Sequence, residues 1–122
     1  MIRDMDLIRQ LLLKIEAMNL PHGATVFVEP YEPELFVEGY TTDQIAYNLD
    51  LLFDGGFVNG QRAMTHFGIA GLTWQGHELL DDIRDPEIWN KTKARVKGVA
   101  GIGVQFLWEI AKAELKTTLG LP

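Results

Sequence analysis

The sequence predicts an α+β fold that is mostly helical, within one small globular domain. Three stretches, 4–18, 42–54 and 102–117, repeat apolar residues at helical spacing. Short apolar runs bounded by glycine or proline predict a few short strands on either side of the second stretch. A length of 122 residues and an apolar content of 47% suffice for a hydrophobic core.

The first helix is predicted over residues 4–18, DMDLIRQLLLKIEAM, where the apolar residues form one broad stripe. Residues 23–40 follow as an acidic segment, which we interpret as a solvated connector or as a partner-binding patch. Within it, residues 26–28 and 35–37 could form short strands, which two prolines restrict to edges or bends.

The second helix is predicted over residues 42–54, with Thr42 as its N-cap and a Gly-Gly pair after its end. Residues 57–58 start a strand, and Asn59-Gly60 is a tight-turn signal. An irregular stretch follows, and residues 69–73 are expected to return as the second strand of a hairpin.

The next helix is predicted to begin after the N-cap Thr73 and to run to about Arg84. Gly76 would allow another element to approach closely, and Trp74 would contribute to burial. Asp85-Pro86 then starts a further helix, because proline at the first helical position loses no hydrogen bond.

The last helix, 102–117, has only a narrow polar stripe, so it must pack on more than one side. It either closes the core or forms a homodimer interface, since symmetric dimers are the commonest oligomers. We therefore divide the chain into a core, 1–85, and a C-terminal helical extension, 86–122, which belongs to the same domain or to a dimer interface.

The order helix, short strand, helix and hairpin is close to that of a winged helix. In such folds the helix before the hairpin is the recognition helix, and the hairpin is the wing. The short helix that usually precedes the recognition helix is replaced here by GYTT, 39–42. The sequence thus predicts a winged-helix-like domain with extra C-terminal helices.

The composition indicates the cellular compartment of the protein. The chain has no cysteine, which excludes disulfides and thiolate chemistry and suits a reducing compartment. The N-terminus is unlike a secretory signal, and the most apolar window, 99–108, is too short to cross a bilayer. We expect a cytoplasmic protein without membrane contact.

The net charge of −6 is unevenly distributed. Residues 1–85 hold five Lys/Arg against fourteen Asp/Glu, and residues 86–122 hold six against three. An acidic body repels phosphate backbones at long range, so a nucleic-acid partner is disfavoured.

His77 and Asp81 share one helix face, with Arg84 one turn on. This pattern could hold a metal or pair a base with a carboxylate, but no third ligand or nucleophile motif accompanies it. We interpret the segment as a structural joint in which His77 makes a hydrogen bond or ion pair, and we expect no enzymatic activity, catalytic residue, metal or cofactor. The joint residues are Thr73, Trp74, Gly76, His77 and Asp81.

Two sets of residues are candidates for partner contact. The predicted recognition face consists of Gln44, Tyr47, Asn48 and Leu51, where Gln and Asn could read adenine. The predicted anion or nucleic-acid contacts are Arg62 on the hairpin and the only basic cluster, Lys91, Lys93, Arg95 and Lys97.

The segments RDMDLIRQLLLKIE, GYTTDQIAYNLDLLFDGGFV and LTWQGHELLDDIRDPEIWNKTK together resemble an uncharacterised family of small proteins from bacteria, their phages and prophages. The resemblance covers nearly the whole chain. It implies a winged-helix-like fold and a phage or prophage setting, and it carries over no catalytic residue. This chain has Leu79 where the pattern favours phenylalanine, and Asn48 where a histidine is expected.

Two functions follow from these observations. The first is a non-enzymatic protein-interaction or regulatory module on a winged-helix-like scaffold, favoured because the second helix is acidic. The alternative is a DNA-binding transcriptional regulator that uses the 43–54 helix and the Lys91–Lys97 cluster.

Overall fold

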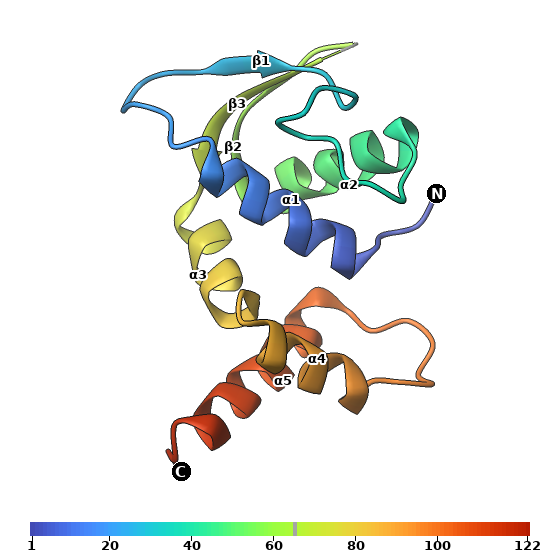
Figure 1. The fold of residues 1–122 in the computed structure, drawn as a ribbon, viewed down its shortest axis with the longest axis vertical. Helices are drawn as coiled ribbons and strands as arrows, with labels where there is room; N and C mark the ends of the chain where they lie inside the picture. The colour runs from blue at the N-terminus through green and yellow to red at the C-terminus, as the bar shows by residue number, and fades with distance from the viewer. Residues whose placement is uncertain (65) are drawn as a thin grey trace. The chain divides into compact units, whose positions relative to one another are not determined.

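A computed structural model describes residues 1–64 and 66–122 (Figure 1). The chain divides into two compact units, Met1–His77 and Glu78–Pro122. Five helices and a three-stranded antiparallel sheet are found in the described residues, which confirms an α+β fold rich in helix. Among these residues no helix is long and apolar enough to span a membrane.

The first unit begins with α1 (Met5–Ala17), whose N-cap Asp4 accepts a hydrogen bond of 3.1 Å from the Leu7 backbone N–H. Helical periodicity predicted this element to within one residue at each end. β1 (Val26–Val28) follows, as expected. The second expected strand, 35–37, is wrong, because these residues lie in a series of turns around the buried Leu35.

α2 (Thr42–Asp54) has Thr41 as its N-cap, so the predicted cap at Thr42 is off by one residue. The Thr41 hydroxyl accepts a hydrogen bond from the Gln44 backbone N–H at 3.1 Å, and the Gln44 side-chain oxygen accepts one from the Thr41 N–H at 2.9 Å. This reciprocal pair is a capping box, which stabilises the first turn and orients the Gln44 side chain back toward the cap.

β2 (Val58–Arg62) and β3 (Phe67–Leu72) form the hairpin, and β3 lies in the middle of the sheet order β1-β3-β2. The predicted turn at Asn59-Gly60 is wrong: this pair lies inside β2, at an irregularity in the register. A Cβ on Gly60 would lie 1.9 Å from the Gly68 carbonyl oxygen. Only glycine fits here, because β2 and β3 approach each other closely at this position. The hairpin turns instead after Arg62.

The core of the first unit lies where α1 contacts α2 and β3, and where α2 contacts β2 (Figure 1). Leu7, Leu11, Ile45, Leu49 and Ile69 are completely buried. Phe53 of α2 stacks on Phe67 of β3, with ring centroids 5.9 Å apart. The apolar stripes that predicted α1 and α2 are therefore the surfaces that pack.

α3 (Trp74–Ile83) runs from the first unit into the second, which continues with α4 (Pro86–Arg95) and α5 (Val104–Thr118). Asp85 caps α4 and Pro86 occupies its first turn, as the sequence predicted. Trp108 of α5 donates a hydrogen bond of 2.6 Å from its indole nitrogen to the Asp82 carboxylate.

Candidate functional site

Asn48, one of the four residues predicted to read DNA bases, is buried with 1% of its surface exposed. Its side-chain oxygen accepts a hydrogen bond from the Asp4 N–H at 2.8 Å, and its amide nitrogen donates to the Gln44 carbonyl at 2.9 Å. Asn48 therefore joins the start of the chain to α2, and its assignment to a recognition face is wrong. Of the other three, the Gln44 side chain belongs to the capping box, Tyr47 is 37% exposed and Leu51 is partly buried.

Arg62, the predicted phosphate contact on the hairpin, faces carboxylates of α2. Its guanidinium lies 2.7 Å from an Asp54 oxygen and 3.5 Å from an Asp50 oxygen. All three side chains are partly exposed, so the stabilisation is small, but the positive charge of Arg62 is neutralised where a duplex would have to bind.

The predicted basic cluster is also largely paired. Lys91 lies 3.3 Å from the Glu87 carboxylate, and the Lys93 ammonium lies 5.8 Å from the centre of the Trp89 ring. Arg95 forms an ion pair with Glu114, whose side chain is only 9% exposed. Arg95 is thus a structural partner of α5, and only the Lys97 side chain of this cluster lacks a charged or aromatic partner among the described residues.

The joint at the start of α3 contacts backbone groups of the segment between α2 and β2. The Thr73 hydroxyl donates to the Gly56 carbonyl at 2.6 Å and accepts from the Gly76 N–H at 3.0 Å. A Cβ on Gly76 would lie 2.1 Å from the Phe57 carbonyl oxygen, so the expected close approach is present. Trp74 is 80% exposed, so its predicted burial is wrong.

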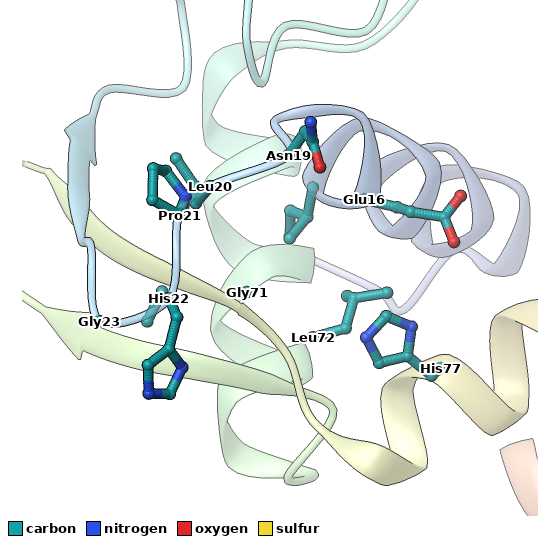
Figure 2. Close-up of a pocket in the computed structure, with 11 residues that line it drawn as sticks. Glu16, Asn19, Leu20, Pro21, His22, Gly23, Gly71, Leu72 and His77 are labelled. Carbon is teal, nitrogen blue, oxygen red and sulfur yellow. The ribbon is translucent and has the colours of Figure 1, made fainter.

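His77 lines a pocket of about 380 Å³ between the end of α1, the following turn and β3 (Figure 2). In this view the His77 ring lies beside Leu72. His22 lines the same pocket from the turn before β1. Within residues 1–64 and 66–122, the His77 side chain makes no hydrogen bond or ion pair, contrary to the bond expected for it. Asp81 instead pairs with Arg84 at 2.8 Å.

The described residues contain no group of three or more His, Asp or Glu side chains that could hold a metal ion. The pocket beside His77 is lined by Glu16, Asn19 and the two histidines, with an apolar wall from α1 and β3. This arrangement supplies hydrogen-bonding groups but no assembled acid, base and nucleophile, so it supports no specific reaction.

A second hollow, of about 390 Å³, lies between α2, the turn after β1 and the tip of the hairpin. Tyr31 and Met64 are exposed at 64% and 103%, and both line it. The Glu29 carboxylate accepts a hydrogen bond from the Tyr31 hydroxyl, and this bond with the nearby negative charge raises the pKa of Tyr31 above its ordinary value of 10.0.

The sequence indicated that the acidic 23–40 segment is a solvated connector or a partner-binding patch, and it did not predict this hollow. Its lining residues come from three separate parts of the chain: 29–31, 42–50, and the described hairpin residues 63, 64 and 67. No local pattern shows that these segments meet. The only related feature in the sequence was the run of glutamates in the 23–40 segment.

Comparison with known proteins shows the family to which the chain belongs. Residues 2–103 match the family model described as "Hypothetical protein (DUF2513)", so the chain belongs to this family. A relative from Haemophilus influenzae, an uncharacterized protein, is 34% identical over 99 residues, which cover 78% of each chain. No solved structure matches the chain.

Proposed function

We propose that this member of the DUF2513 family is a non-enzymatic module that binds another protein through the acidic side of α2 and the adjoining hairpin. Regulation in a phage or prophage setting is part of the proposal and rests on the resemblance of the sequence motifs. The observation that carries the proposal is the charge of α2, which presents Asp43, Asp50 and Asp54 but no Lys or Arg.

The scaffold in this proposal is a winged-helix-like domain. The sheet order β1-β3-β2, with α2 between β1 and β2 in the chain, supports this architecture. In it, α2 takes the place of the recognition helix and the β2–β3 hairpin takes the place of the wing. The same scaffold hosts many functions, so the partner must be inferred from the surface.

That surface favours a protein over a duplex. Phosphate contacts supply much of the affinity for DNA, and Arg62, the only cation of β2 and β3, is paired with two carboxylates of α2. Carboxylates beside exposed apolar side chains such as Met64 are instead suited to a basic protein surface with apolar contacts.

Charge reversal tests the proposal. Asp43→Lys with Asp50→Lys should abolish capture of a partner from host lysate, and Glu34→Lys with Glu38→Lys should retain it. The control pair changes the charge equally within the same unit and lies outside the hollow. A partner held equally by both double variants would contradict the proposal.

Duplex DNA binding is the competing outcome. Fluorescence anisotropy with labelled duplex at low and physiological salt should show no specific binding. Tight binding with a steep salt dependence, lost in Lys91→Glu with Lys97→Glu, would establish the DNA-binding alternative. Arg95→Glu is unsuitable here, because it would place a second carboxylate beside Glu114.

A further inference from the structure

We infer that the hollow between α2, the turn after β1 and the hairpin tip receives an arginine side chain of the protein partner. This inference rests on the proposed function and names the chemistry of the partner: a basic segment that presents arginine beside apolar residues.

All the charged residues that line the hollow are acidic. Three carboxylates, those of Glu29, Asp43 and Asp50, line the hollow, and no Lys, Arg or His is among its lining residues. The Asp43 carboxylate has no ion-pair partner in the described part of the chain. Asp50 is only weakly engaged, at 3.5 Å from Arg62. A cation entering the hollow would therefore find at least one free carboxylate and gain Coulomb energy.

The walls are apolar and aromatic, which suits a guanidinium better than an ammonium. The lining includes the exposed Tyr31, the largely buried Phe67, and the small apolar residues Pro30, Ala46 and Ala63. A guanidinium is planar and weakly hydrated, so it can stack on an aromatic face and donate two hydrogen bonds to one carboxylate. An ammonium would lose more hydration in the same hollow.

Arg62 shows that carboxylates of α2 accept a guanidinium. Its donor nitrogen lies 2.7 Å from an Asp54 oxygen, one turn along α2 from Asp50. Arg62 does not line the hollow, so the hollow stays open to a guanidinium from another protein. The volume of about 390 Å³ lies at the lower end of the range for ligand pockets, which is ample for one long side chain.

The test is an amide NMR titration of the whole chain with N-acetyl-arginine amide and with N-acetyl-citrulline amide. Citrulline has nearly the same shape but no charge. The arginine probe should give saturable shifts at the amides of Ala46, Ala63 and Met64, and the citrulline probe should give none. N-acetyl-lysine amide should bind several-fold more weakly than the arginine probe.

Asp43→Asn should weaken arginine binding by about tenfold, because it removes a charge-assisted hydrogen bond. Glu38→Gln, which has the same charge change outside the hollow, should leave the affinity unchanged. Unaltered spectra of both free variants would show that the fold is retained.

Equal shifts from the citrulline probe, or equal weakening by Glu38→Gln, would overturn the inference. Equal affinity for the lysine probe would overturn the assignment to arginine. The titration uses the protein alone, so its failure can be separated from failure of the proposed function. If partner capture depends on Asp43 and Asp50 while the arginine probe does not bind, only the inference fails.

Discussion

The Phe57 carbonyl oxygen lies so close to Gly76 that a Cβ at position 76 would be only 2.1 Å from it. The same carbonyl accepts a hydrogen bond from the Thr73 backbone N–H at 3.1 Å, and the Gly56 carbonyl accepts one from the Thr73 hydroxyl at 2.6 Å. The start of α3 is therefore attached at two adjacent points to the segment that precedes β2. Gly76 is needed because a backbone group, and not a movable side chain, fills this space.

Gly76→Ala should therefore destabilise the protein, although alanine is the better helix former. We expect a loss of about 2 kcal/mol in the free energy of unfolding, the usual range for overpacking against a fixed group. Urea denaturation followed by circular dichroism measures it, with the exposed Gln75→Ala as control. An unchanged or increased stability would show that the Phe57 carbonyl can move aside.

Asn48→Ala should cost about 2 kcal/mol of stability, because the Asp4 N–H and the Gln44 carbonyl lose a buried partner. Thr42→Ala, on the exposed first turn of the same helix, should have little effect. The same denaturation measurement applies. A neutral Asn48→Ala would be inconsistent with a structural role and would reopen recognition by this side chain.

Arg95→Glu should destabilise the second unit far more than Lys97→Glu, because it leaves Glu114 poorly solvated beside a like charge. The expected loss is about 2 to 3 kcal/mol, reduced from that of a fully buried pair since Arg95 is 56% exposed. Tryptophan fluorescence during denaturation, in a Trp74→Phe background, reports this unit through the buried Trp89 and Trp108. Equal losses for the two variants would mean that the Arg95–Glu114 pair contributes nothing.

Glu29→Gln should lower the pKa of Tyr31 toward 10.0, because the hydrogen bond to Glu29 and its charge raise it. A raised pKa means that the folded state favours the neutral hydroxyl. The resulting stabilisation is present below pH 10.0 and is lost as the pH rises through the folded pKa. Tyrosinate absorbance in a Tyr40→Phe, Tyr47→Phe background reports Tyr31 alone. No downward shift would exclude the Glu29 contact.

The sequence predicted a homodimer formed through the 102–117 helix, which corresponds to α5. This prediction can be tested on an exposed residue of α5. Phe106 is 58% exposed on this helix, so a second copy could cover it. Phe106→Glu should convert a dimer to a monomer in analytical ultracentrifugation, whereas the neighbouring Gln105→Glu should not. A wild-type protein that stays monomeric at high concentration would rule the dimer out.

The sequence by itself determined the helices and their caps to within about two residues, because both depend on neighbours in the chain. The apolar spacing of residues 42–54 was sufficient to predict the bounds of α2, and Asp85-Pro86 was sufficient to predict the start of α4. The hairpin was predicted in part: its second strand was found, but Asn59-Gly60 was assigned to a turn, since a glycine needed for close strand contact looks the same locally.

Only the tertiary structure decided which polar side chains are available to a partner. Asn48 looked free for recognition but bonds to Asp4, 44 residues away, and Arg95 looked free for anions but pairs with Glu114, 19 residues away. The candidate hollow likewise assembles from three distant segments. The physical reason is the same in each case: pairing and burial depend on which segments meet in space, and periodicity along one helix carries no information about that.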